Sequence, residues 1–153
     1  MSDAIGVWRA YIEALNRHDV EAVLEVVSED VIYDERPMTM RAPVVGKERM
    51  AAYWRRAFAI LPDLSIEILT LDVGRDGAWS ESIMRGTQSG KVGWTPPSGK
   101  RMEARVACAF QVTAGKLAHE RLYWDRANTL RQFGRIPAVI GLLRNPVVWF
   151  SGS

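Results

Sequence analysis

An alternating run from Lys100 to Thr113, followed at once by a second extended run, constrains the fold of this chain most. In a β-strand, successive side chains point to opposite faces. One face of the first run is therefore apolar and carries Met102, Ala104, Val106, Cys108, Phe110 and Val112. The second run, Lys116 to Asp125, lies beyond the turn residues Ala114 and Gly115. Together the two runs predict an antiparallel hairpin.

The register of this hairpin decides which side chains of the second run share the apolar face. A two-residue loop at Ala114 and Gly115 pairs Thr113 with Lys116. Counting outward predicts that Phe110 pairs with His119, Cys108 with Arg121, Val106 with Tyr123 and Ala104 with Asp125. The ionisable side chains then lie on the apolar face, and one additional loop residue would move Asp125 to the opposite face.

Asp125 is the predicted general acid/base. A carboxylate among apolar side chains loses hydration, which raises its pKa toward the range useful for proton transfer. We expect His119 to be a proton shuttle or a structural hydrogen-bonding residue. Arg121 would stabilise an enolate oxygen, or would pair with Asp125 and lower the pKa of that carboxyl. The alternative for Asp125 is a structural role, capping the next helix through N–H groups near Asn128.

Size and charge indicate one domain of ordinary size. The chain has 153 residues, of which 48% are hydrophobic, and a net charge of +2 from 20 basic and 18 acidic residues. The basic residues form no long run, which argues against a nucleic-acid partner. Proline, glycine and arginine interrupt the stretch Ile136 to Phe150, so no membrane span is expected. The single cysteine, Cys108, and a first segment unlike a secretory signal favour the cytoplasm.

Periodicity divides the chain into helices followed by strands. Apolar residues at helical spacing predict three helices: Ile5 to Leu15, a second one capped by Asp19, and a third that follows Gly46 and includes Leu61. A short strand, Val31 to Tyr33, precedes the third. Four strands follow, at Leu64 to Val73, Trp79 to Ser89, Lys100 to Thr113 and Lys116 to Asp125, and a short helix ends at Gly134. This order predicts an α+β fold in which a curved antiparallel sheet wraps around three N-terminal helices.

Several motifs resemble the SnoaL-like polyketide (ester) cyclases of the nuclear transport factor two and ketosteroid isomerase superfamily. They are Leu15-Asn16-Arg17-His18-Asp19, Leu61-Pro62-Asp63, Arg85-Gly86-Thr87-Gln88-Ser89-Gly90, Pro96-Pro97-Ser98-Gly99, Gly115 to Asp125 and Leu130-Arg131-Gln132-Phe133-Gly134. The resemblance implies a cone-shaped domain at 1–134 that encloses an apolar pocket. Residues 135–153 are then an apolar tail, packed on the domain or at an oligomer interface. Family members are often dimers, and an outer sheet face with Trp124, Leu122 and Ala107 predicts a homodimer.

The resemblance also implies an activity for Asp125. In the cyclases of this family, the aspartate that ends the last strand is the general acid/base of a cofactor-free intramolecular aldol ring closure. Two positions depart from the family pattern. Gln88 stands where His is usual, and His119 and Arg121 stand where an acidic and an aromatic residue are common. These departures affect the expected substrate more than the expected fold.

We expect a cofactor-independent enzyme that acts on a hydrophobic, carbonyl-bearing small molecule by aldol cyclisation or isomerisation. The expected substrate-binding residues are Gln88, Tyr11, Trp54, Phe58, Phe110 and Tyr123. No metal is expected, because His18 and His119 have no companion at ligand spacing. The resemblance implies that no cofactor is needed. Two alternatives stay open: an epoxide or ester hydrolase of the same fold, with Asp34 or Glu81 as second carboxylate, and a non-catalytic binding domain.

Overall fold

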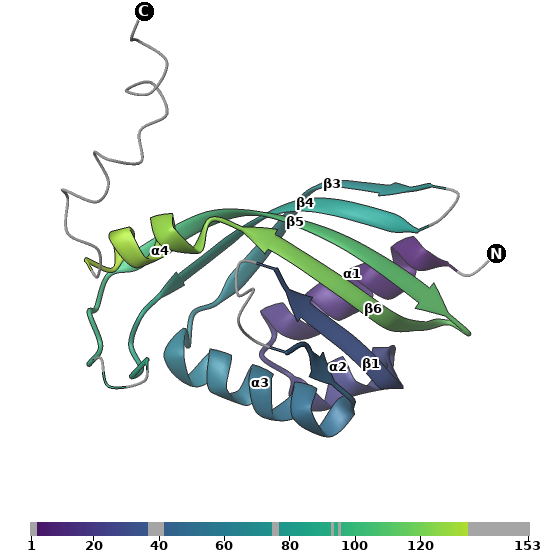
Figure 1. Ribbon diagram of the computed structural model, residues 1–153, viewed down its shortest axis with the longest axis horizontal. Coiled ribbons are helices and arrows are strands. Elements are labelled where there is room, and N and C mark those ends of the chain that lie inside the picture. The colour runs from purple at the N-terminus through teal and green to yellow at the C-terminus, as the bar shows by residue number, and fades with distance from the viewer. Residues whose placement is uncertain (1–2, 37–41, 75–76, 93, 95, 135–153) are drawn as a thin grey trace, which may run out of the picture.

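The computed structural model describes residues 3–36, 42–74, 77–92, 94 and 96–134. These residues form four helices and a six-stranded sheet (Figure 1), which confirms the predicted α+β fold. The helices are α1 (Ala4–Asn16), α2 (Val20–Val26), α3 (Lys47–Ile60) and α4 (Arg126–Gln132). The strands are β1 (Val27–Glu35), β2 (Val44–Val45), β3 (Ser65–Val73), β4 (Ala78–Thr87), β5 (Arg101–Thr113) and β6 (Lys116–Trp124). The predicted tail, 135–153, lies outside the described residues.

The strand order is β2-β1-β6-β5-β4-β3. Strands β3 to β6 form the predicted antiparallel meander. Strand β1 pairs in parallel with β6, so the sheet is mixed rather than wholly antiparallel. The long strands curl over α1, α2 and α3, which lie on one side of the sheet, and α4 follows β6 at one end (Figure 1). We call the side of the sheet that faces α1 the inner face and the opposite side the outer face.

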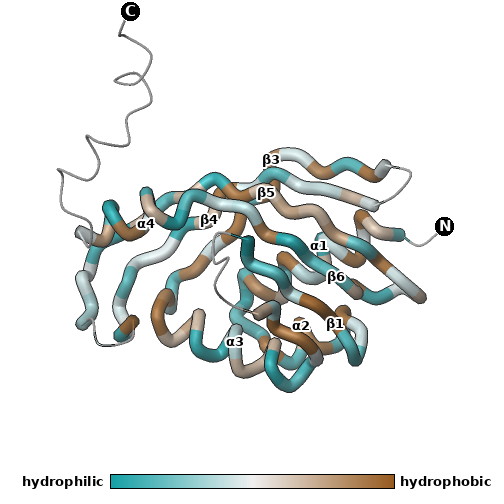
Figure 2. Tube along the Cα trace, in the orientation of Figure 1, coloured by the Kyte–Doolittle hydropathy of each residue, from teal (hydrophilic) through white to brown (hydrophobic). Residues whose placement is uncertain are grey.

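Aromatic side chains join the helices to the inner face. Trp8 of α1 stacks on Phe110 of β5, with ring centroids 4.1 Å apart and planes 10° apart. Tyr11, one turn further along α1, meets the edge of Trp54 from α3 at 6.4 Å. All four rings are buried. Hydrophobic and hydrophilic residues alternate along the strands (Figure 2), as expected for a sheet with only one face covered.

The family-like segment Leu15 to Asp19 has a structural role. Asn16, the last residue of α1, donates from Nδ2 to the Ile66 carbonyl at 2.9 Å and accepts from the Ile66 N–H at 2.7 Å. His18 Nε2 lies 2.9 Å from the Leu64 carbonyl oxygen. These contacts fasten the end of α1 to β3, on which the helix packs.

The turn of the β5–β6 hairpin is the predicted one. Ala114 and Gly115 have φ values of 50° and 73°, and both central residues of a type I′ turn need positive φ. Thr113 pairs with Lys116, which confirms the first predicted pair.

The register beyond the turn is not the predicted one. Val112 still pairs with Leu117, but Gln111 pairs with His119. Ala118 is therefore an additional residue in β6, a β-bulge. Because side chains alternate with a period of two, the bulge exchanges the two faces of the rest of β6.

The predicted cross-strand pairs are wrong by one residue. Phe110 pairs with Glu120, Cys108 with Leu122 and Val106 with Trp124, rather than with His119, Arg121 and Tyr123. The inner face of β6 thus carries Leu117, Glu120, Leu122 and Trp124. Asp125 lies beyond the end of β6 and has no partner in the ladder, so its predicted pairing with Ala104 is also wrong.

Candidate active site

Glu120 is the one carboxyl of β6, and it points into the core. It lies opposite Phe110 on the inner face and is only 4% exposed. The Cys108 thiol donates to Glu120 Oε1 at 3.6 Å. Glu120 Oε2 has no hydrogen-bond partner among the described residues. One carboxylate oxygen is therefore held by the protein, and the other has no partner in the described part of the chain.

Burial sets the proton affinity of this carboxyl. Loss of hydration raises the pKa of Glu120 from 4.5 to about 7, while the nearby Tyr11 hydroxyl and the Cys108 thiol act in the opposite direction. At neutral pH the group is close to half-protonated, so it can accept a proton and return it. Burial and the charge of Glu120 also raise the pKa of the Cys108 thiol, which therefore stays protonated.

Tyr11 brings a hydroxyl from α1 toward Glu120. Its side chain is fully buried, and Oη forms no hydrogen bond of standard geometry within the described part of the chain. Burial, and then the negative charge of Glu120, raise the pKa of Tyr11 well above 10.0. Tyr11 therefore remains a neutral donor beside the carboxyl.

Other buried donors on this side of the sheet also lack partners. Ser80 and Ser82 alternate along β4, opposite Cys108 and Val106, and so lie on the inner face. The side-chain groups without a hydrogen bond to any described residue include Trp8 Nε1, Trp54 Nε1, Ser80 Oγ and Ser82 Oγ. A buried polar group is costly unless it is paired. These donors are therefore suited to the oxygen atoms of a bound molecule.

A second set of polar side chains lies next to Glu120, on β1 and α3. Tyr33 is the partner of Glu120 in the parallel β1–β6 ladder, and both side chains are buried. Tyr33 Oη lies 3.2 Å from Tyr53 Oη, and Tyr53 donates to Glu35 Oε2 at 3.4 Å. Trp124 Nε1 donates to Glu35 Oε1 at 2.9 Å. We call Tyr33, Tyr53 and Glu35 the tyrosine–glutamate chain.

Asp125 has the surroundings of a helix cap rather than of a buried acid. It is exposed, and its Oδ1 accepts a hydrogen bond from the Asn128 N–H at 2.9 Å as the N-cap of α4. The predicted helix cap at Asp125 is thus confirmed. The prediction that Asp125 is buried among the apolar residues of β5 was wrong, because the bulge at Ala118 shifts the register of β6 by one residue.

His119 and Arg121 lie on the outer face, away from Glu120. In the β1–β6 ladder Arg121 is beside Asp34, which pairs with Arg36 at 2.6 Å. Partial burial and the neighbouring Arg121 lower the pKa of His119, and Asp34 opposes them. The expectation that His119 and Arg121 share a face with the apolar residues of β5 was wrong.

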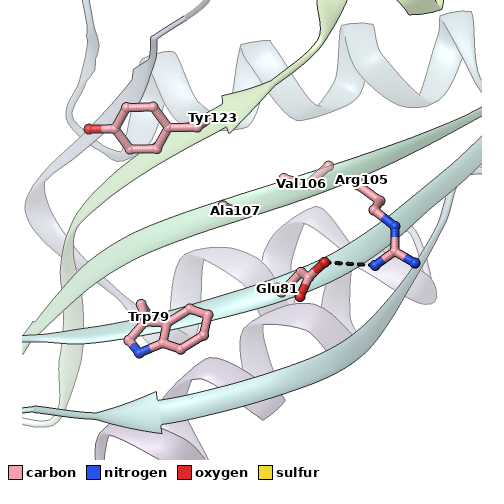
Figure 3. Close-up of a pocket in the computed structure, with 6 residues that line it drawn as sticks. All are labelled: Trp79, Glu81, Arg105, Val106, Ala107 and Tyr123. Carbon is pink, nitrogen blue, oxygen red and sulfur yellow. Dashed lines mark hydrogen bonds and ion pairs between the residues drawn. The ribbon is translucent and has the colours of Figure 1, made fainter.

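Tyr123 and Glu81 also lie on the outer face. They line a shallow pocket of about 310 Å³ with Trp79, Arg105, Val106 and Ala107 (Figure 3). Glu81 pairs there with Arg105 at 2.7 Å. Neither Glu81 nor Asp34 therefore points into the core as a second carboxylate, and Tyr123 does not line the interior.

The remaining predicted binding residues divide between the core and a loop. Tyr11, Trp54 and Phe110 are buried near the inner face, as expected. Phe58 is partly buried and stacks on Trp54, with ring centroids 5.8 Å apart. Gln88 is 1% exposed, and its Nε2 donates to the Gly90 carbonyl at 3.1 Å. The Gln88 amide thus helps to hold the loop after β4.

The sequence does contain a signal for the bulge. Leu117 and Leu122 are both buried, yet an odd number of positions separates them. In a regular strand such residues face opposite sides, so a strand that buries both needs one additional residue between them. The spacing does not fix the position of the additional residue, and only the observed position at Ala118 turns Glu120 inward.

Within the described residues no group of three or more His, Cys, Asp and Glu side chains is arranged to hold a metal ion. No helix in that same part of the chain combines the length and apolar character needed to cross a bilayer.

The fold is similar to that of several solved structures. AclR from Streptomyces galilaeus, proposed to be a hydroxylase, matches with a TM-score of 0.75 and 18% identity over 90% of this chain and 99% of its own. IdmH from Streptomyces antibioticus, proposed to be a polyketide cyclase, matches with a TM-score of 0.74 and 21% identity over 86% of this chain and 99% of its own. An LEH-like epoxide hydrolase from M. tuberculosis matches with a TM-score of 0.68 and 18% identity over 92% and 94%.

Among curated protein sequences, none matches significantly. The sequence model of the SnoaL-like polyketide cyclases matches residues 5–133, which include almost all of the described chain. The chain therefore belongs to the SnoaL-like polyketide cyclase family.

Proposed function

We propose that this protein is a cofactor-independent acid/base enzyme that acts on a hydrophobic, carbonyl-bearing small molecule, with Glu120 as the general base. The observation that carries the proposal is the buried Glu120 carboxyl, with a pKa of about 7 and one oxygen without a partner in the described chain. Membership of a cyclase family supports the reaction class.

The proposed reaction begins with proton transfer from a carbon next to a carbonyl. Glu120 takes the proton, so a C–H bond breaks, an O–H bond forms on the carboxyl, and the electron pair becomes an enolate. The neutral hydroxyls of Tyr11 and Ser80 would stabilise the enolate oxygen inside a site from which water is excluded. The enolate then attacks a second carbonyl of the same molecule, which closes a ring, or regains the proton at another carbon, which isomerises the molecule.

Hydrogen exchange tests this proposal without knowledge of the natural substrate. A panel of cyclic ketones and diketones is incubated with the protein in D₂O, and deuterium uptake next to the carbonyl is followed by NMR. We expect Glu120→Gln to reduce uptake by a factor of about 10² or more, because Gln keeps the shape but cannot take the proton. Uptake that is equal in wild type and Glu120→Gln would refute the role of Glu120.

Asp125 remains the competing assignment for the general base, and the same assay separates the two. Asn is also a good N-cap, so Asp125→Asn should preserve α4. If Asp125 is the base, Asp125→Asn loses exchange and Glu120→Gln keeps it. Absence of exchange with every ketone in the panel would instead favour a non-catalytic binding domain.

Hydrolysis is the second candidate function. One similar structure is an epoxide hydrolase, and such chemistry uses a second carboxylate. Glu35 is connected to the inner face through Tyr53 and Tyr33, whereas the candidates Asp34 and Glu81 point outward. Incorporation of ¹⁸O from labelled water into an epoxide or ester would favour this function over cyclisation.

We also propose a homodimer and a cytoplasmic location. The face predicted for the dimer contains Ala107, but Leu122 and Trp124 lie on the inner face instead. Trp79 and Tyr123 are each 45% exposed on the outer face and replace them there (Figure 3). Sedimentation of wild type and Trp79→Glu tests the dimer, since a charge at this position should favour the monomer. The single cysteine suits a reducing compartment.

A further inference from the structure

We infer that Glu35 is the proton-exchange partner of Glu120, and that Tyr53 and Tyr33 connect the two carboxyls as a proton relay. The inference rests on the proposed role of Glu120 and adds residues to it. It starts from the hydrogen bonds of the tyrosine–glutamate chain and from the position of Tyr33 beside Glu120.

The hydrogen bonds of this chain have one consistent direction. The Glu35 carboxylate can only accept, so Tyr53 donates its single hydroxyl proton to Glu35 Oε2. Tyr53 must then accept in its contact with Tyr33, which makes Tyr33 the donor at 3.2 Å. The lone pairs of Tyr33 Oη are left to accept a proton from the interior.

Glu120 is the ladder partner of Tyr33, although no hydrogen bond joins the two side chains in the described part of the chain, so the first transfer requires their approach. Tyr33 and Glu120 are partners on adjacent parallel strands, and buried side chains of such partners lie next to each other on one face. The charge of Glu120 contributes to the raised pKa of both Tyr33 and Tyr53, as does the charge of Glu35. Both tyrosines are therefore within electrostatic range of the two carboxyls.

Exchange of a buried base with water needs such a route. Glu120 is 4% exposed, so its proton has no direct path to water. Glu35 is only partly buried and stands at the end of β1. Its second oxygen is held by the Trp124 indole N–H, which keeps the carboxylate aimed at Tyr53.

The proposed transfer is balanced at every atom. Protonated Glu120 gives its proton to Tyr33 Oη, the Tyr33 proton passes to Tyr53 Oη, and the Tyr53 proton passes to Glu35. Each tyrosine gains one O–H bond as it loses another, so negative charge moves from Glu35 to Glu120 without a free tyrosinate. The reverse sequence returns the proton.

Time-resolved infrared spectroscopy tests the relay on the intact protein, without a substrate. Protons are released from a caged-proton compound at pH 8, and the carboxyl band of Glu120, assigned with Glu120→Gln, is followed as the group protonates. Tyr53→Phe and Glu35→Gln should each slow this step by roughly tenfold or more. Asp34→Asn is the matched control, because it removes the same charge from the next residue of β1, on the outer face. The protonation rate of Glu120 in Asp34→Asn should stay within about twofold of the wild-type rate.

The outcomes separate the relay from the proposed function. Unchanged protonation rates in folded Tyr53→Phe and Glu35→Gln would overturn the relay, while deuterium exchange would still report on Glu120. Equal slowing in Asp34→Asn would also overturn it, since charge alone would then explain the effect. Deuterium exchange that is retained in Glu120→Gln would refute the proposed function, whatever the result for the relay.

Discussion

Glu120 lies directly opposite Phe110 across the β5–β6 ladder, with both side chains in the core. This pairing exists because Ala118 is an additional residue in β6, which turns Glu120 inward and His119 outward. A carboxyl in this position carries an energetic cost that depends on pH, and that dependence can be measured.

The stability of the protein should fall as pH rises through neutrality. In the unfolded chain Glu120 loses its proton near pH 4.5, whereas in the folded chain it keeps the proton up to about pH 7. The folded state therefore binds more protons between these values, and its free energy of unfolding decreases with pH by about 3 kcal/mol from this group. Glu120→Gln removes the contribution, so its stability relative to wild type should increase by that amount between pH 4.5 and 8. Urea unfolding at several pH values measures it, and a pH-independent difference would contradict the burial of this charge.

Removal of the bulge should destabilise the folded protein far more than a substitution at the bulged residue. Deletion of Ala118 restores a regular hairpin and would turn His119 and Arg121 inward and Leu122 outward. An unpaired buried charge costs about 3–5 kcal/mol, so we expect the deletion variant to be largely unfolded. Ala118→Gly keeps the additional residue and should cost only about 1 kcal/mol. Circular dichroism distinguishes the two, and a stable, folded deletion variant would show that the bulge does not set the register.

Most of the fold follows from local patterns in the sequence. The turn at Ala114 and Gly115, the cap at Asp19 and the end of α3 before Pro62 each depend on neighbouring residues, and each was predicted. The predicted strand Val31 to Tyr33 was too short, because β1 is extended by its parallel pairing with β6. This pairing joins strands that are far apart in the sequence, so no local pattern predicts it.

The candidate site was less predictable than the fold, because one residue decides it. Each apolar position of β5 was placed correctly, but the faces of β6 depend on whether Ala118 is paired or bulged. The family resemblance and a hairpin without a bulge both favour Asp125. Glu35 and Tyr33 join the site only through the β1–β6 pairing, for which the sequence has no local signal.

Asp125 should matter for stability more than for catalysis. Its side chain caps α4 through the Asn128 N–H. Asp125→Ala should therefore lower the free energy of unfolding by about 1 kcal/mol, while Asp125→Asn should change it little. Both variants should retain deuterium exchange with ketones. Loss of exchange in Asp125→Asn, with unfolding unchanged, would contradict the assignment of Glu120.

Tyr11 should tune the acidity of Glu120. The Tyr11 hydroxyl lowers the pKa of the carboxyl and thereby offsets part of the effect of burial. Tyr11→Phe should raise that pKa further and move the acidic limb of any activity to higher pH, because a general base must be deprotonated to act. Tyr123→Phe is the control, since it removes a hydroxyl from the outer face of the same sheet. A lowered or unchanged pKa in Tyr11→Phe would show that the two groups do not interact.

The pKa of Glu120 is the most direct test of this account. With ¹³C-labelled glutamate, NMR titration of wild type and Glu120→Gln assigns the side-chain carboxyl resonance and follows it between pH 3 and 9. A buried, inward-facing Glu120 should titrate at about pH 7. A midpoint near the ordinary value of 4.5 would place the carboxyl in water and contradict its role as the buried base.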